Sequence, residues 1–362
     1  MNSREVDIAV FGSGLLARLL AGLLAQAHGR RVALVTQSDA AYRLARSFDI
    51  SVAPVTRPET WALLAQTVPE TLRLLAQMGG RTACQRLDPL FVTTTQRGRQ
   101  GLAHIRHMAA GFGHDAQVLP AEALGADREG LILRDAVLLM RGEAEPLADA
   151  WLAGLGVPVL QQQRVHAEVS GGGTARIEAE SIHLEASMAV LADDAAVLAH
   201  AGHGIGGLLE ARSTSALLAG SSQTSWAPFV VDVDGGTQVL QTGPHALTVV
   251  AAGETDDAAE VVIDLLRRPT PLHVWSRTSF RQLIARDGAP VVGRPQDRGA
   301  MVLAGLGLTS AFIAPALARW LAGTASQAED GYFAARGFSR TSDRSPVAEF
   351  APLSARQAGA PA

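Results

Sequence analysis

The order of the first three elements, an apolar strand, a glycine turn and an apolar helix, limits the fold most narrowly. Residues 8 to 11 are all apolar, as in a strand buried on both faces of a parallel sheet. Gly12-Ser13-Gly14 follows at once, and leucines then recur at helical spacing as far as Leu24. Residues 32 to 35 are apolar again. The sequence therefore predicts a strand–helix–strand unit and an α/β fold.

The glycine turn matches the spacing of a dinucleotide-binding loop, Gly12-x-Gly14-x-x-Ala17. The first glycine allows a tight turn, the second lets the backbone approach a pyrophosphate, and a small third residue lets helix and strand pack closely. The positive end of the helix dipole favours the phosphates. We therefore expect dinucleotide binding. A glycine turn in an unrelated α/β protein is the alternative.

The end of the second strand leaves the choice of dinucleotide open. An acidic residue is expected there to accept hydrogen bonds from the adenosine ribose. Here Thr36 and Gln37 follow the strand, and the nearest acid is Asp39. Arg43 and Arg46 would suit the 2′-phosphate of NADP, whereas Thr36 or Gln37 could still bond to the ribose hydroxyl of FAD.

The composition excludes several kinds of chemistry. All 31 basic residues are arginine, so Schiff-base catalysis, pyridoxal phosphate attachment and a Walker-type phosphate loop, which all need lysine, are ruled out. A net charge of -4 gives no reason to expect a nucleic-acid partner. Cys84 is the single cysteine, so no internal disulfide can form, and we expect a cytoplasmic protein.

Further strands and helices are predicted along the rest of the chain. The patterns favour helices over 60–80, 147–155, 258–268 and 311–321, a hairpin turn at 171–173, a buried strand at 188–192, and antiparallel strands within 226–252. Residues 300 to 318 carry no charge, but their glycines and Pro315 indicate a strand, a turn and a buried helix, with no membrane span.

Three segments near the C-terminus carry a resemblance to a known family. They are 275–281 with the sequence Trp-Ser-Arg-Thr-Ser-Phe-Arg, then 286–293 with Arg-Asp-Gly-Ala-Pro-Val-Val-Gly, and then 302–307 with Val-Leu-Ala-Gly-Leu-Gly. Together with the N-terminal loop, this pattern resembles the FAD-dependent oxidoreductases of the D-amino-acid oxidase and glycine oxidase type, over about residues 6 to 336. The resemblance implies a Rossmann-like FAD-binding domain with a second, antiparallel-sheet substrate domain.

The resemblance also implies roles for individual residues. Arg281 would bind a substrate carboxylate, because a guanidinium can do so through two parallel hydrogen bonds. FAD would be bound noncovalently, and no metal site is expected. The implied cofactor-binding residues are Gly12, Ser13, Gly14 and Ala17 at the pyrophosphate, Thr36 and Ser47 nearby, Val165 at the adenine, Ala192 before a turn against the cofactor, and Gly305, Leu306, Gly307, Leu308 and Thr309 at the flavin.

Three positions depart from the family pattern. Leu306 stands where a histidine is usual, and Ser310 and Asp193 stand where glycines are usual. A carboxylate near a flavin phosphate is unfavourable unless it points away or pairs with an arginine.

The sequence therefore predicts a flavoprotein that oxidises a C–N bond of a small amine or amino acid. We expect an FAD-binding domain formed by 1–85, 145–205 and 273–336, a substrate domain formed by 86–144 and 206–272, and a loose tail over 337–362. Two alternatives stay open: a subordinate or non-catalytic flavoprotein subunit of a hetero-oligomeric dehydrogenase, and an NADP-linked reductase. Homo- or hetero-oligomers are both compatible with the sequence.

Overall fold

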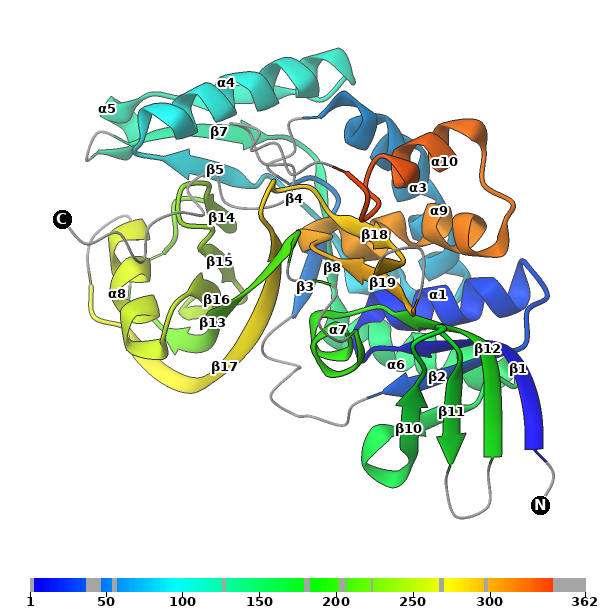
Figure 1. Ribbon diagram of the computed structural model, residues 1–362. Coiled ribbons are helices and arrows are strands. Elements are labelled where there is room, and N and C mark those ends of the chain that lie inside the picture. Colours follow the sequence, from blue (N-terminus) through cyan, green and yellow to red (C-terminus); the bar gives the residue numbers. More distant parts are fainter. Residues whose placement is uncertain are drawn as a thin grey trace.

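The first sheet is mostly parallel and contains the N-terminal strand at its centre. The computed structural model describes residues 3–36, 47–53, 57–125, 128–178, 183–201, 205, 207–222, 224–266, 270–295 and 299–340. Strand β1 pairs in parallel with β2 and β12, and β9 and β19 extend the sheet in parallel on either side. The hairpin β10–β11 and the short β18 add antiparallel pairs (Figure 1). The bounds are β1 Ser3–Phe11, β2 Val32–Thr36, β9 Val159–Gln161, β10 His166–Val169, β11 Ala175–Glu178, β12 His183–Leu191, β18 Val291–Gly293 and β19 Met301–Ala304.

Helices cover one face of this sheet. Helix α1 carries six leucines in 12 residues and is buried along most of its length, because it packs against both α6 and α9. Helix α3 packs in turn on α9, and α10 contacts α9 and β18. Their apolar side chains form one core with those of β1 and β2. The bounds are α1 Leu15–Gln26, α3 Pro58–Gln77, α6 Arg141–Gly154, α9 Ser310–Ala322 and α10 Gln327–Ala334.

The opposite face of the sheet is covered by the short helix α7, Asp194–His200, which contacts β12 and β19. A second core lies there, and it includes Leu283 and Ala285 from the end of β17.

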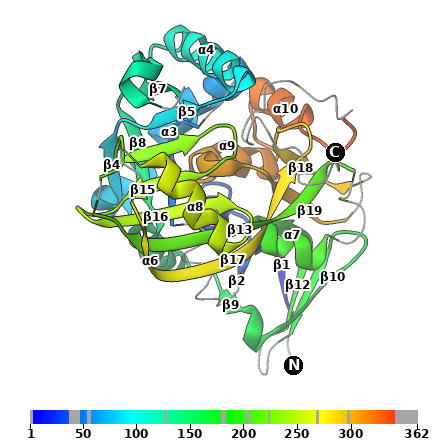
Figure 2. The ribbon, with the colours of Figure 1, turned by 90° about the vertical axis from the view of Figure 1, so that its left-hand side faces the viewer.

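The second sheet has the order β17-β13-β16-β15-β14-β5-β7-β6 and is antiparallel except between β14 and β5. Helix α4 lies along one outer edge of the molecule, at the top of Figures 1 and 2. Helix α8 packs on β13 and β16. The bounds are β5 Leu90–Thr93, α4 Gln96–Gly111, β6 Ala116–Leu119, β7 Glu129–Leu133, β13 Leu209–Gly220, β14 Phe229–Asp232, β15 Gln238–Gln241, β16 Ala246–Ala252, α8 Thr255–Leu265 and β17 His273–Ala285.

A third sheet has three strands in the order β3-β8-β4. Its strands are β3 Phe48–Ile50, β4 Cys84–Leu87 and β8 Ala136–Met140. The short α5, Ala121–Leu124, precedes β7. Three 3-10 helices complete the described elements: η1 Gly80–Ala83, η2 Gln162–Arg164 and η5 Gly307–Thr309.

Most elements expected from the sequence are present, with one displaced boundary. The helices near 60–80 and 311–321, the hairpin at 171–173 and the antiparallel strands within 226–252 are confirmed as α3, α9, β10–β11 and β14–β16. Residues 273–285, which we expected in the FAD-binding domain, instead form β17 at the edge of the second sheet, the long curved strand that is yellow in Figure 1.

The start of the expected loose tail is anchored, which corrects that expectation for residues 337 to 340. The Arg340 guanidinium forms a largely buried ion pair with Asp287, with 2.7 Å between Nε and Oδ2. It also donates to the carbonyl oxygens of Ala289 and Pro290. Arg340 therefore holds the turn that follows β17. Residues 341–362 lie outside the described part of the chain.

The uncharged stretch over 300–318 divides into β19, a glycine turn and α9, as expected. Among the described residues, no helix has the length and apolar character that crossing a bilayer requires.

Candidate functional site

The loop after β1 lies where the carboxyl ends of three parallel strands meet. The Gly12 N–H donates to the carbonyl of Val35 at the end of β2, 3.0 Å away, and the Ala192 N–H donates to the carbonyl of Phe11, 2.8 Å away. A Cβ atom on Gly12 would lie only 2.9 Å from the Cβ of Ala17. The close packing of loop and helix therefore requires a glycine at 12 and a small residue at 17.

The N-terminus of α1 points its backbone N–H groups toward this edge. Gly14 is the N-cap residue, no side chain caps the helix, and its first turn contains no acidic residue. The helix dipole therefore favours an anion there. Arg18, one turn on, donates to the carbonyl of Ser13 and forms an ion pair with Asp149. Arg18 thereby links the loop to Asp149 of α6.

Asp193 places a carboxylate directly on the loop. Its Oδ2 accepts a hydrogen bond from the Ser13 N–H at 2.7 Å, and its Oδ1 accepts one from the Ala196 N–H at 2.8 Å. Asp193 thus caps helix α7 and binds the glycine loop with the same side chain, which is only 4% exposed. A pyrophosphate would have to lie close to the backbone of this loop, and the Asp193 carboxylate already lies close to it.

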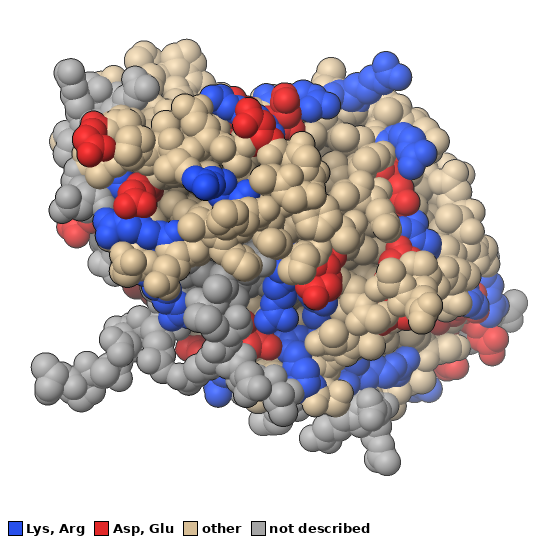
Figure 3. Space-filling model, turned by 90° about the horizontal axis from the view of Figure 1, so that it is seen from above, with Lys and Arg blue, Asp and Glu red and all other residues tan. Residues whose placement is uncertain are grey.

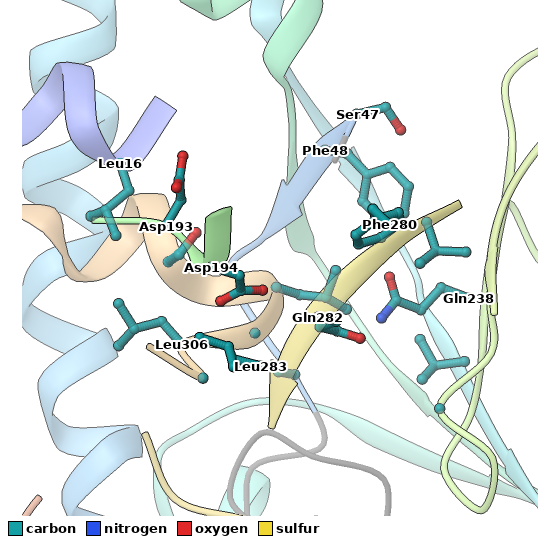
Figure 4. A pocket seen from close by; sticks show the side chains of 18 of the residues that line it. Leu16, Ser47, Phe48, Asp193, Asp194, Gln238, Phe280, Gln282, Leu283 and Leu306 are labelled. Atoms are coloured by element: carbon teal, nitrogen blue, oxygen red, sulfur yellow. The ribbon is translucent and has the colours of Figure 1, made fainter. Parts of the chain in front are cut away.

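A cavity of about 90 Å³ leads from this loop toward the second sheet. Figure 4 shows Leu16 and Asp193 at one end and Phe280, Gln282 and Gln238 at the other. Small-molecule sites commonly measure roughly 300–1,000 Å³. A dinucleotide would therefore need lining side chains to move. Six of the residues expected at the cofactor line this cavity: Ser47, Ala192, Gly305, Leu306, Gly307 and Leu308.

The turn between β19 and α9 forms one wall. Gly305 and Gly307 have φ angles of +69° and +57°, which favour glycine. The following helix begins at Ser310, which also lines the cavity, and no side chain caps its N-terminus. Leu306, at the position where the family has histidine, is buried in the core beside α1.

A buried ion pair joins three elements next to this wall. Arg141, at the start of α6, donates from Nη2 to Asp49 Oδ1 in β3 at 2.8 Å, and Asp49 also accepts from the Ser310 hydroxyl at 2.9 Å. Arg141 and Asp49 are 4% and 0% exposed. The charges satisfy one another, so the pair fixes the relative positions of β3, α6 and α9 around the cavity.

The far end of the cavity contains an arginine that sequence reasoning missed. Arg212 on β13 lies opposite Gln282 on β17 and donates to its side-chain oxygen at 3.2 Å. Its Nε is buried without a hydrogen-bond partner, and burial lowers the pKa of its guanidinium. No carboxylate in the described part of the chain forms an ion pair with Arg212. A half-buried cation whose hydrogen bonds are incomplete suits an anionic group of a ligand.

Arg281, the residue expected to bind a carboxylate, is not brought to the cavity. Phe280 and Gln282 line it, and successive side chains of a strand point to opposite faces. Arg281 is exposed and lies opposite Ser213, whose hydroxyl bonds to Glu254 outside the cavity. The cavity is lined instead by the two neighbours of Arg281 on β17 and by Arg212 on the adjacent strand β13.

Asp232 at the end of β14 adds a titratable group to the lining. Its carboxylate accepts hydrogen bonds from the N–H groups of Asp234 and Gly235. Burial raises the pKa of Asp232 in spite of these bonds. The cavity is therefore lined by a half-buried cation, a half-buried acid and two glutamine amides, Gln238 and Gln282.

The remaining expected cofactor residues lie near the loop or away from the cavity. The Thr36 hydroxyl is buried and donates to the carbonyl of Leu160 at 3.4 Å, and the Thr309 hydroxyl donates to that of Leu306. Val165 packs against the second core. Ser47 lines the cavity, and its buried hydroxyl has no hydrogen-bond partner. Gln37, Asp39, Arg43 and Arg46 lie outside the described residues.

Charged side chains of both signs are interspersed on the face seen from above in Figure 3.

Within the described residues, no group of three or more His, Cys, Asp and Glu side chains is arranged to hold a metal ion.

Comparison with known proteins bears on the fold. No family model matches the sequence, and no curated protein matches it. Among solved structures, the chain is similar to L-amino acid deaminase from Proteus vulgaris, with 15% identity, a TM-score of 0.69, and coverage of 94% of this chain and 95% of that one. Glycine oxidase from Geobacillus kaustophilus has 16% identity, a TM-score of 0.68 and coverage of 91% and 98%. L-proline dehydrogenase from P. horikoshii has 13% identity, a TM-score of 0.68 and coverage of 92% and 97%.

These similarities extend over nearly the whole of each chain, although few residues are identical. They confirm the expected fold, in which a Rossmann-like sheet and a second, largely antiparallel sheet are combined as in the D-amino-acid oxidase-like proteins.

Proposed function

We propose that this protein is an FAD-dependent oxidoreductase that oxidises the C–N bond of a small amine bearing a carboxylate, such as an amino acid. One observation carries the proposal: a single cavity connects the turn at Gly305 and Gly307, beside the dinucleotide loop, with the half-buried guanidinium of Arg212. The solved structures of similar fold are an amino-acid deaminase, an amino-acid oxidase and an amino-acid dehydrogenase by name.

The residues around the loop suit a dinucleotide in most respects. The uncapped N-terminus of α1 would stabilise the pyrophosphate, and the unpartnered Ser47 hydroxyl offers it a hydrogen bond. Backbone groups of the turn at Gly305 and Gly307 and of the start of α9 would hold the flavin. When bound, FAD supplies the acceptor for the hydride that leaves the substrate carbon. Asp193 is the exception, because its charge opposes a phosphate.

At the other end, Arg212 takes the role first expected for Arg281. Its guanidinium would bind the substrate carboxylate, and its bond to the Gln282 amide fixes its orientation. The carboxylate anchor would direct the amine-bearing carbon toward the turn at Gly305 and Gly307. These groups contribute by positioning, and the reaction needs no general base from the described lining.

The experiment that tests the proposal uses the full-length protein and matched pairs of substrates. FAD binding is measured first by the change in flavin fluorescence. Anaerobic bleaching of the bound flavin is then followed with amino acids and with the corresponding amines that lack the carboxylate. We expect bleaching by at least one amino acid and little by its partner amine. A protein that does not bind FAD would refute the proposal.

A subordinate flavoprotein subunit is the second candidate, and Asp193 and Leu306 favour it, because both depart from the family pattern next to the implied cofactor. It predicts FAD binding with no bleaching by any amine unless a partner protein is added. An NADP-linked reductase, the third alternative, predicts binding of NADP in preference to FAD. The same binding measurement made with both dinucleotides separates these cases.

A further inference from the structure

The Asp193 carboxylate holds the position on the glycine loop that an anionic ligand would take. Phosphate and carboxylate oxygens both accept hydrogen bonds from backbone N–H groups, so they compete for the same donors. Oδ2 of Asp193 already bonds to the Ser13 N–H and lies 3.2 Å from the place where a Cβ of Gly12 would be. We propose that Asp193 sets the affinity of this loop for dinucleotides by competing with the pyrophosphate.

The surroundings of Asp193 strengthen the competition. The side chain is 4% exposed, so solvent screens its charge poorly. Within the described residues, no arginine or histidine forms an ion pair with Asp193. Its two recorded hydrogen bonds come from backbone N–H groups, one at the start of α7 and one in the loop itself. A pyrophosphate entering the loop would therefore meet a like charge that no arginine pairs with directly.

Binding then requires an exchange of partners. The Asp193 side chain must release the Ser13 N–H and turn away, while its second bond, to the Ala196 N–H, can still cap α7. The unliganded loop is stabilised by the same bond that the ligand must replace. Dinucleotide affinity is lowered by this exchange, and the purified protein is expected to carry little cofactor.

This inference rests on the proposed function, because it assumes that the loop receives the pyrophosphate of FAD. The experiment compares the wild-type protein with Asp193→Asn, which keeps an oxygen acceptor and removes the charge. Asp234→Asn is the matched control, since the Asp234 carboxylate also accepts hydrogen bonds from backbone N–H groups, those of Thr94 and Thr95, but does not line the cavity. The probes are FAD, adenosine diphosphate and adenosine, measured by titration calorimetry.

We expect Asp193→Asn to bind FAD and adenosine diphosphate at least tenfold more tightly than the wild type and to bind adenosine equally well. The unliganded variant should also melt at a lower temperature, because a bond to the loop is weakened. Tighter binding together with lower stability is the combination that a purely structural role for Asp193 does not produce. Asp234→Asn should change adenosine diphosphate binding much less.

Three results would overturn the inference. Unchanged or weaker FAD binding by Asp193→Asn, with a wild type that binds FAD, refutes the competition and leaves the proposed function standing. An equal gain in Asp234→Asn shows a general charge effect instead. If neither FAD nor adenosine diphosphate binds any variant, both proposals fail. If Asp193→Asn does not fold, Asp193→Ser, which keeps a capping hydroxyl without charge, gives the same test.

Discussion

The glycine loop after β1 lies beside one end of the cavity, where Leu16 and Asp193 line it, and the paired strands β13 and β17 form the other end, yet the two regions relate to the sequence in different ways. The loop is built from residues that are contiguous in the chain, and the expected glycines and Ala17 lie together as predicted. At the other end the expected arginine points away, and an arginine 69 positions earlier faces the cavity instead.

The difference follows from what determines each geometry. A strand–turn–helix unit is set by local spacing, because its glycines act on their immediate neighbours. The side of β17 that faces the cavity is set by its pairing with β13, and a slip of one residue exchanges the faces. Motif positions therefore locate the loop reliably, whereas alternation alone leaves two choices for the strand.

The largest expected effect is on stability, and it tests whether the long-range ion pair between Asp49 and Arg141 holds together the elements around the cavity. Asp49→Ala leaves the Arg141 guanidinium buried without its carboxylate, and breaking such a pair costs about 3–5 kcal/mol. Denaturant unfolding should show this loss. Asp7→Ala, which breaks the more exposed pair with Arg31, is the control and should cost less than about 1 kcal/mol. Similar losses for the two variants would contradict the structural role of Asp49.

The second prediction addresses the strand end directly. Arg212→Gln should weaken a carboxylate ligand such as benzoate by roughly ten- to a hundredfold, since a hydrogen bond to a charged group contributes about 1.5–3 kcal/mol. Arg281→Gln should have little effect, because its side chain is exposed on the other face. The dissociation constants of benzoate for both variants are measured by titration of the FAD-loaded protein. The reverse ranking of the two variants would restore the assignment made from the sequence.

The third prediction tests the loop. Gly12→Ala places a Cβ 2.9 Å from that of Ala17, so we expect a loss of about 1–3 kcal/mol in unfolding free energy and weaker dinucleotide binding. Gly142→Ala is the control, since nothing lies within 4 Å of its new Cβ and the site is helical. That variant should be neutral or slightly more stable. Equal melting temperatures for the two would show that the loop is loosely packed.

The smallest expected effect is a pH dependence at Asp232. Burial raises the folded-state pKa of this carboxyl above its unfolded value, so the folded protein holds the proton more strongly. The stabilisation that comes from the protonated Asp232 carboxyl is therefore fully present below its unfolded-state pKa. It is lost as the pH rises through its folded-state pKa. Relative to the wild type, Asp232→Asn should gain stability as pH rises from about 4 toward neutral. A difference that does not change with pH would contradict the direction of the shift.

The elements that the sequence predicts well share strong local signals. Helices α1, α3 and α9 have apolar residues at helical spacing, and the β10–β11 hairpin has its glycine turn. Asp193, Asp49 and Arg141 could not be placed in the same way. Their partners lie 180 and 92 positions away, and no periodic pattern encodes such pairs. Arg212 gave a weak signal, an arginine within a run of strand-like residues, which by itself is typical of a surface position.

The sheet order has a consequence for how the chain reaches this structure. β1, the first strand made, pairs with β12, and β12 completes its pairing with β19, near residue 300. The turn at Asp287 gains its ion pair only when Arg340, more than fifty residues later, has been made. Contacts between residues so far apart in the sequence form slowly during folding, because long loops must close first. During synthesis, the edge of β12 at Val190 and Leu191 therefore stays unpaired until β19 emerges, while β11 already pairs with residues 183–186. We expect chains that stop before β19 to aggregate through that edge, and a chaperone that shields it to raise the yield of soluble protein.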